Sequence, residues 1–257
     1  IPLRLVGSEM CIRDRDINAL ILAGAGSGKT RVLTHRIHYL VSTKNYHVDD
    51  ILAVTFTNKA ANEMKERLSD LLRRPIGRMW VGTFHSLAHR LLRTHPIEAN
   101  LSPTFQILDA QDQFRIIKRL MKENGVDETK FPIKKVQWFI NQQKDEGILP
   151  HEIDAGYNFF VKQSAKVFDL YEKHCQVNDL VDFAGLLVKS YGLLKNNQSL
   201  LEHYQNKFRH ILVDEFQDTN RIQYQFIKIL HNQTNHVFCV GDDDQSIYGW
   251  RGAKIEN

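Results

Sequence analysis

The stretch LILAGAGSGKTRVL, residues 20–33, decides the fold of this chain. Its apolar start is typical of a buried strand, and from Leu33 onward apolar residues recur at helical spacing. Between the two, AGAGSGKT (residues 23–30) fits the phosphate-loop pattern, with alanine in place of the first glycine. The glycines let the backbone turn tightly, so that successive N–H groups point into one concavity. A strand, a glycine-rich turn and a helix in this order predict a phosphate site.

The residues of this loop have distinct expected roles. The backbone N–H groups and the positive end of the following helix would attract phosphate oxygens. Lys29 would reach the β- and γ-phosphates of a nucleoside triphosphate, and the Thr30 hydroxyl would bind Mg²⁺. A glycine-rich turn with an incidental lysine is the alternative interpretation. The predicted nucleotide-binding residues of the loop are Ala23, Gly24, Ala25, Gly26, Ser27, Gly28, Lys29 and Thr30.

A pair of acids supplies a partner for this loop. In ILVDEF (residues 211–216), Asp214 and Glu215 follow an apolar run, at the end of a strand where open parallel sheets bind ligands. Asp214 would hold Mg²⁺, usually through water, and Glu215 would orient and deprotonate the attacking water. Alone, such a pair is often a solvated turn. Together with the phosphate loop, it predicts hydrolysis or transfer of a nucleoside triphosphate.

The order of apolar runs predicts an α/β fold. Strand patterns occur at residues 19–23, 51–56, 79–84, 210–216 and 236–242, and helical periodicity separates most of them. This alternation implies a parallel sheet with helices on both faces. Residues 96–198 carry long, polar-rich helical segments with few strand patterns. We therefore expect a sheet domain made of residues 16–95 and 199–257, interrupted by a mostly helical insertion at residues 96–198.

The composition is that of a soluble globular protein. The chain has 257 residues, of which 42% are hydrophobic and 25% charged, and its net charge of +4 agrees with a nucleic-acid partner without requiring one. No apolar run approaches the roughly eighteen residues of a membrane span. Cys11, Cys175 and Cys239 are widely spaced, which predicts no disulfide framework and no zinc site. We expect a cytoplasmic protein that has no contact with a membrane.

Residues 1–15, IPLRLVGSEMCIRDR, match nothing in this organisation. They lack an initiator methionine and a helical or strand period, and they end in alternating charges. We interpret them as a non-native or misassembled leader. A divergent chain terminus is the alternative.

Five further stretches carry a resemblance to a known family. They are TFTNKAANEMKERL (55–68), GTFHSLAHRLLR (82–93), LVDFAGLL (180–187), LVDEFQDTN (212–220) and VGDDDQSIYGWRGA (240–253). With the phosphate loop, this ordered set resembles the superfamily 1 DNA helicases of the UvrD, Rep and PcrA group, from about residue 17 to the end. The resemblance implies two RecA-like domains that close on ATP, of which this sequence would hold the first with its helical insertion.

The resemblance also implies an activity and its substrates. We expect an ATP-dependent 3′–5′ helicase that uses ATP and Mg²⁺, acts on single-stranded DNA and duplex junctions, and has repair proteins as further partners in DNA repair or replication. By the same resemblance, Gln245 would sense the γ-phosphate and join Lys29 and Glu215 in catalysis. Arg31 would stack on the nucleotide base. The implied DNA-binding residues are Phe56, Asn58, Thr83, His85, Tyr248, Trp250 and Arg251.

One departure from the family and several alternatives stay open. The glutamine that reads adenine upstream of the phosphate loop has no counterpart, because the first glutamine is Gln106. A helicase–nuclease subunit of the RecB and AddA type would share these motifs. The isolated chain could instead be a non-catalytic single-strand binding module. Without arginines from a second RecA-like domain, we expect it to hydrolyse ATP very slowly. A phosphate-loop enzyme of small-molecule metabolism would not need the stretches QSIYGWRG and TFTNKAA.

Overall fold

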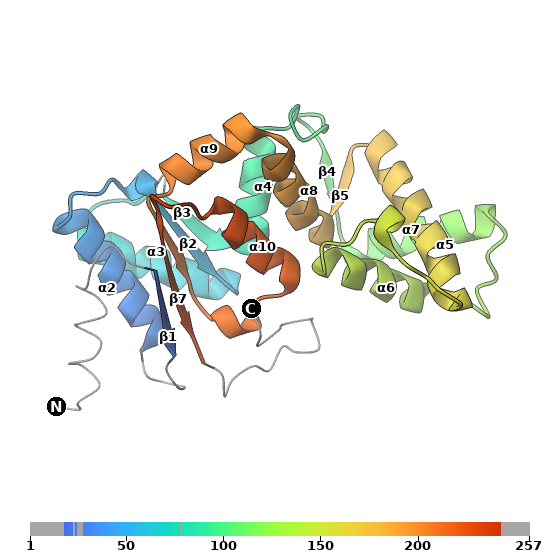
Figure 1. Cartoon of the computed structure of the whole chain (residues 1–257), viewed down its shortest axis with the longest axis horizontal. Coiled ribbons are helices and arrows are strands. Elements are labelled where there is room, and N and C mark those ends of the chain that lie inside the picture. Colours follow the sequence, from blue (N-terminus) through green and yellow to red (C-terminus); the bar gives the residue numbers. More distant parts are fainter. Residues whose placement is uncertain (1–17, 23, 25–27, 78, 243–257) are drawn as a thin grey trace.

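The computed structural model describes residues 18–22, 24, 28–77 and 79–242 (Figure 1). Its main feature is a five-stranded sheet in which every neighbouring pair is parallel. In spatial order the strands are β1 (Ala19–Leu22), β7 (His236–Gly241), β6 (His210–Val213), β2 (Ile51–Thr55) and β3 (Trp80–Thr83). The predicted α/β fold with a parallel sheet is confirmed.

The observed strands end before the predicted strand patterns do, and the difference is largest at β6. The strand expected at residues 210–216 ends at Val213, and the 3-10 helix η3 (Phe216–Asp218) follows almost at once. The reason is local: Glu215 has φ 50° and ψ 48°, a left-handed conformation that no strand contains. Two further 3-10 helices are η1 (Val48–Asp50) and η2 (Pro150–Glu152).

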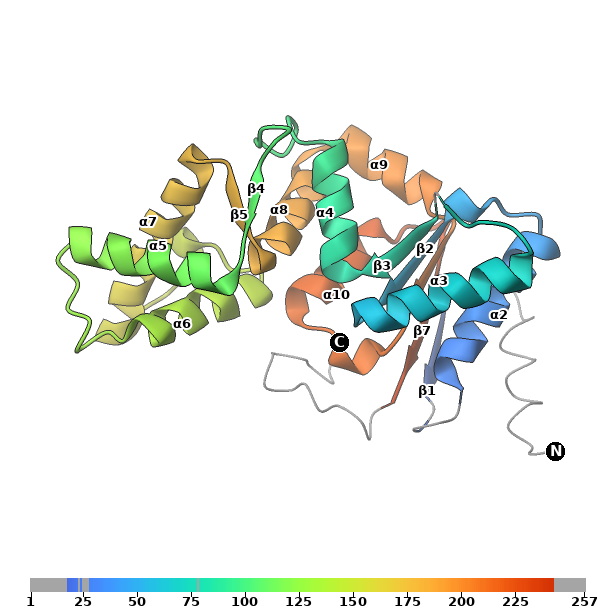
Figure 2. The same cartoon turned by 180° about the vertical axis from the view of Figure 1, so that it is seen from behind.

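Helices cover both faces of the sheet (Figures 1 and 2). Alternate residues of β2 belong to different buried clusters, as the pleat of a strand requires. Ile51 and Ala53 pack with helices α2 (Lys29–Ser42) and α3 (Asn58–Leu72). Leu52 and Val54 pack with the helices on the opposite face, which are α4 (Phe84–Thr94), α8 (Phe183–Asn196), α9 (Gln198–Lys207) and α10 (Arg221–Leu230). Burial on both faces explains why the strands have continuous apolar sequences.

The middle of the chain forms a second, mostly helical body with its own buried cluster. Helices α5 (Ala110–Glu123), α6 (Ile133–Asp145) and α7 (Phe159–Val177) are all present where helical segments were predicted. The sequence did not predict the parallel pair β4 (Gln106–Leu108) and β5 (Leu180–Asp182). Each of these strands has three residues, too few to show an alternating pattern.

The predicted domain boundaries at residues 96 and 198 stay a prediction. Helix α8, inside the predicted insertion, contributes Leu187 and Leu194 to the same buried cluster as Leu52 of the sheet. Within the described residues, none of the helices has both the length and the apolar content that crossing a bilayer requires. The predicted leader at residues 1–15 lies outside the described residues.

A buried carboxylate joins the helical body to helix α8. Asp182 is 4% exposed, and its Oδ2 accepts hydrogen bonds from Lys144 Nζ (2.8 Å), Tyr171 Oη (2.7 Å) and Gln113 Nε2 (3.0 Å). Its Oδ1 accepts the Gly185 N–H (2.6 Å) and so caps α8. One side chain therefore connects α5, α6, α7 and α8.

The charges in this cluster support one another. Burial alone would lower the pKa of the Lys144 ammonium, but the carboxylates of Asp182 and Glu172 outweigh it and raise that pKa. Burial alone would raise the pKa of Asp182, but Lys144 and the hydrogen bonds hold it below its usual value. Both groups are therefore charged at neutral pH, and each depends on the other.

We predict that Asp182→Ala lowers the free energy of unfolding at pH 7 by about 3–5 kcal/mol, because it leaves a buried ammonium without its main partner. Urea titration followed by far-ultraviolet circular dichroism measures the change. The matched control is Asp169→Ala, which breaks an exposed pair with Lys173 (2.6 Å). An exposed pair contributes about 1 kcal/mol or less. Equal losses in the two variants would contradict the assigned role of Asp182.

Candidate functional site

The carboxyl ends of all five strands lie along one edge of the sheet, because the strands are parallel (Figure 1). The predicted site residues follow these ends. Gly28 and Lys29 come after β1, Asp242 after β7, and Asp214 after β6. Four of the predicted DNA-facing residues, Phe56, Asn58, Thr83 and His85, lie at or after the ends of β2 and β3, and the other three follow β7 in the sequence. Since β1 and β3 are at opposite ends of the strand order, we name the two ends of the site after the roles predicted for their residues: the nucleotide end lies near β1, and the DNA end lies near β2 and β3.

Lys29 is the centre of the nucleotide end. Gly28 has φ 86°, a left-handed conformation suited to glycine, and α2 then begins at Lys29 with no side-chain cap. The Lys29 side chain is buried although a cation at the start of a helix is opposed by the helix dipole. Two carboxylates offset this repulsion: its Nζ lies 3.2 Å from Asp242 Oδ2 and 3.7 Å from Glu215 Oε2.

Thr30 and Asp214 meet beside Lys29. The Thr30 hydroxyl donates a 2.9 Å hydrogen bond to Asp214 Oδ2, across 184 positions of sequence. Burial raises the pKa of Asp214 to about 6, although the Thr30 hydroxyl opposes this and Glu215 adds to it. A hydroxyl and a carboxylate are oxygen donors of the kind that Mg²⁺ uses together with phosphate and water. Within the described ranges, three or more His, Cys, Asp or Glu side chains nowhere gather into a metal site. A magnesium ion would therefore need nucleotide oxygens or water as further ligands.

Glu215 has an unusual backbone and a close partner. Its left-handed conformation (φ 50°) is disfavoured for a residue with a side chain, and such strain is common at functional sites. The Glu215 N–H donates to Asp214 Oδ1 (3.1 Å), and Glu215 Oε2 accepts from Gln217 Nε2 (2.8 Å). The sequence did not assign a role to Gln217, although it lies inside the stretch LVDEFQDTN.

Several predicted site residues are not tested by these contacts. Arg31 is exposed on α2, where its Nε lies 3.4 Å from His35 Nε2, and its stacking on a base stays a prediction. Gly24, the second residue of the predicted loop, is exposed. The following predicted residues lie outside the described residues: Ala23, Ala25, Gly26, Ser27, Gln245, Tyr248, Trp250 and Arg251.

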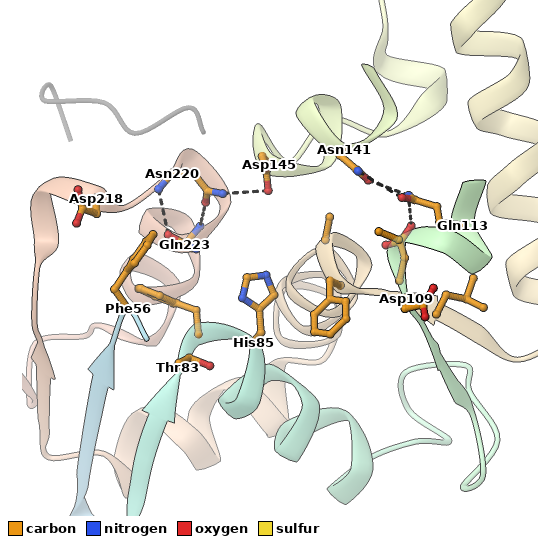
Figure 3. A pocket seen from close by; sticks show the side chains of 16 residues that line it. Phe56, Thr83, His85, Asp109, Gln113, Asn141, Asp145, Asp218, Asn220 and Gln223 are labelled. Carbon is orange, nitrogen blue, oxygen red and sulfur yellow. Dashed lines mark hydrogen bonds between the residues drawn. The ribbon is translucent and has the colours of Figure 1, made fainter. Parts of the chain in front are cut away.

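The DNA end of the sheet opens into a cavity of about 430 Å³ between the strand ends and the helical body (Figure 3). We call it the junction pocket. Phe56, Thr83 and His85, three of the predicted DNA contacts, line it together. Asn58 does not; it is exposed at the first turn of α3. Thr83 is also structural, because its Oγ1 accepts the Ser86 N–H (3.2 Å) at the start of α4.

The walls that the described residues give the junction pocket are polar. Carboxylates and side-chain amides dominate the lining from the helical body and the η3–α10 segment, and among the described residues none of those lining it is Lys or Arg. They are Asp109, Gln113, Asn141, Asp145, Asp182, Asp218, Asn220 and Gln223. Carboxylates repel phosphates but can accept hydrogen bonds from base edges, and side-chain amides can both donate to base edges and accept from them. This chemistry suits a nucleobase better than a phosphate.

Phe183 is a lining residue to which the sequence assigned no role. Its side chain is 56% exposed, and its ring lies 6.1 Å from that of His85 in an edge-on arrangement. It belongs to LVDFAGLL, one of the stretches that carry the family resemblance. Its place in this stretch was the one indication in the sequence that Phe183 has a functional role. An isolated phenylalanine after a short strand is more often a core residue. Here its neighbour Asp182 is buried and Phe183 projects toward the pocket.

Comparisons with known proteins give one matching family model and a set of similar relatives. A family model described as the UvrD/REP helicase N-terminal domain matches residues 10–257. DNA helicase II of Escherichia coli (strain K12) is 54% identical over 240 residues, which cover 93% of this chain and 33% of that protein. The ATP-dependent DNA helicase PcrA of Staphylococcus epidermidis is 42% identical over 247 residues, or 96% of this chain and 34% of that protein. The chain thus spans about a third of the length of these curated relatives.

Asp218 lies between the two ends of the site. Its side chain is buried, lines the junction pocket, and has an Oδ1 without a hydrogen-bond partner among the described residues. Burial raises the pKa of Asp218 to about 6, and the Glu215 carboxylate adds to the effect. Ionising this carboxyl group is therefore harder in the folded chain than in the unfolded chain.

We predict that Asp218→Asn changes stability in a pH-dependent way. Above about pH 6 the folded wild type must keep an unfavourable buried charge, whereas below about pH 4 the group is protonated in both states and the penalty vanishes. The unfolding free energy of the variant, relative to wild type, should therefore rise between pH 4 and pH 7. Urea titrations at the two pH values measure this. A difference that does not change with pH would contradict the raised pKa.

Proposed function

The chain belongs to the UvrD/REP helicase N-terminal domain family, and from that membership we propose that it supplies the ATP-hydrolysing part of a 3′–5′ DNA helicase moving along single-stranded DNA. The observation that carries the proposal is the convergence of Lys29, Thr30, Asp214 and Glu215 at one edge of a parallel sheet. Relatives of about three times the length are named DNA helicases. Unwinding, direction of movement and a role in repair belong to the proposal for the whole protein.

We assign the nucleotide steps to the residues at the β1, β6 and β7 ends. Lys29 would exchange its contact with Asp242 for the β- and γ-phosphates, which offer a stronger negative charge to the start of α2. Thr30 and Asp214 would hold Mg²⁺, the ion that neutralises developing charge on the phosphates. Glu215 would accept a proton from the attacking water, and its fixed position near Lys29 favours that role.

The DNA contacts are assigned to the other end of the sheet. Phe56 and Phe183 would stack on bases, a sequence-independent interaction, and His85 would bond the backbone. Tyr248, Trp250 and Arg251 follow β7 in the sequence and would complete this surface by resemblance. A non-catalytic module that binds single-stranded DNA is the rival proposal, and it differs in that its DNA affinity would not respond to nucleotide and DNA would not stimulate hydrolysis. A RecB- or AddA-type helicase–nuclease would share this site.

Two variants separate nucleotide binding from hydrolysis. We predict that Lys29→Ala weakens binding of Mg²⁺–ATP at least tenfold, because the charge facing the phosphates is lost. Glu215→Gln should bind within about twofold of wild type but hydrolyse about 100-fold more slowly, since only the base is changed. A fluorescent ATP analogue measures binding. Single-turnover hydrolysis, with the chain in excess over radiolabelled ATP, resolves slow rates.

The control for these variants is Lys44→Ala, an exposed lysine beyond the end of α2. It should bind and hydrolyse ATP like wild type. Equal loss of binding in Lys29→Ala and Glu215→Gln would undo the separation of their roles. Unchanged binding in Lys29→Ala would show that the phosphate site is elsewhere.

A second pair of variants tests the DNA surface. We predict that Phe56→Ala and Trp250→Ala each weaken binding of labelled oligothymidine by about 1–3 kcal/mol, the contribution of one base stack. Fluorescence anisotropy at fixed salt measures the affinity. Trp138→Ala is the control, because Trp138 is an exposed tryptophan on α6 that does not line the junction pocket. An unchanged affinity with a lower melting temperature would mean that these rings only pack.

A further inference from the structure

The amide of Gln217 connects two strand ends. Gln217 lies in η3 and is buried. Its Nε2 donates to Glu215 Oε2 (2.8 Å), and its Oε1 accepts the backbone N–H of Asp242 (2.9 Å), the residue that follows β7. The amide of one side chain therefore donates to a residue that follows β6 and accepts from a residue that follows β7.

Only an amide of this length fits both contacts. Glutamate would keep the acceptor for the Asp242 N–H but place a second carboxylate against Glu215, and an apolar side chain would make neither bond. The position before Asp242 also matters. A Cβ atom on Gly241 would lie 3.0 Å from Gln217 Oε1, which is tighter than most such contacts, so the amide would have to move away from the main chain. The glycine therefore lets the amide reach the main chain.

The Glu215 carboxylate has two competing partners. The same Oε2 that accepts from Gln217 lies 3.7 Å from Lys29 Nζ. Without the amide, the ammonium would be the main attraction for this carboxylate and would draw it toward the start of α2. A base must lie within hydrogen-bond reach of the water that it deprotonates, and a misplacement of about 1 Å can slow a reaction about 100-fold.

We infer that Gln217 is a positioning residue that holds Glu215 for hydrolysis and ties it to the chain after β7. This inference rests on the proposed function. The stretch after Asp242 contains Gln245 and Trp250, the residues assigned to the γ-phosphate and to DNA. A shift of the main chain at Asp242 would move the N–H group that donates to Gln217 Oε1. Because the same amide donates to Glu215, the Glu215 carboxylate would move with it. DNA binding after β7 and hydrolysis at β6 are thereby connected by one side chain.

The test uses Gln217→Met, which keeps the length of the side chain and removes both bonds, and Gln217→Glu, which restores only the bond to Asp242. The matched control is Gln205→Met. Gln205 lies on α9, away from the site, and this change removes the hydrogen bond that its side chain donates to the Ile229 carbonyl (2.8 Å) on α10. The readouts are Mg²⁺–ATP binding, single-turnover hydrolysis with and without oligothymidine, and melting temperature.

Gln217→Met should bind Mg²⁺–ATP within twofold of wild type and hydrolyse it about 10- to 100-fold more slowly, as expected for a displaced base. Its stimulation by oligothymidine should fall toward one. Gln217→Glu should hydrolyse equally slowly, because the bond to Glu215 is not restored. Gln205→Met should change none of these quantities apart from melting temperature.

Two outcomes would overturn the inference alone. One is wild-type hydrolysis and stimulation in Gln217→Met. The other is a loss of binding that follows the fall in melting temperature, as in a merely structural role. A wild-type chain that neither binds nor hydrolyses Mg²⁺–ATP would instead overturn the proposed function, and this inference with it.

Discussion

A buried lysine at the positive end of a helix is the constraint on which the site depends. The helix dipole and desolvation both oppose the Lys29 ammonium, so the fold must bring anions to it. Asp242 and Glu215 do this from the ends of two strands. They can do so because β7 and β6 follow β1 directly in the sheet. The strand order thus provides the charge balance at the start of α2, and phosphate groups suit the same position.

One short segment connects the nucleotide end of the sheet to the junction pocket. Asp214 and Glu215 face Lys29 and Thr30, whereas Asn220 and Gln223, a few residues later, line the pocket. Asn220 Nδ2 also donates to Asp145 Oδ1 (3.0 Å) at the end of α6, so the segment contacts the helical body (Figure 3). The proposed nucleotide site and the helical body therefore contact the same stretch of chain.

Sequence patterns predicted the parts of the structure that local rules determine. The strands are continuous apolar runs because both faces of the sheet are buried. Patterns could not show which distant polar groups pair. The Asp182 cluster joins residues up to 69 positions apart, and Gln217 contacts Asp242 across 25 positions. Such pairs leave no periodicity. The strands β4 and β5 were missed for a different reason, since three residues carry no pattern.

The most direct test of the central claim is a crystal structure of this chain with Mn²⁺ and a non-hydrolysable ATP analogue, in which anomalous scattering locates the metal. We expect Mn²⁺ beside Thr30 and Asp214, with the Lys29 ammonium moved from Asp242 to the β- and γ-phosphates. Glu215 should stay bonded to Gln217 and face the γ-phosphate. A nucleotide bound elsewhere, or a metal away from Thr30 and Asp214 with Lys29 still paired to Asp242, would contradict the claim that this edge of the sheet is the ATP site.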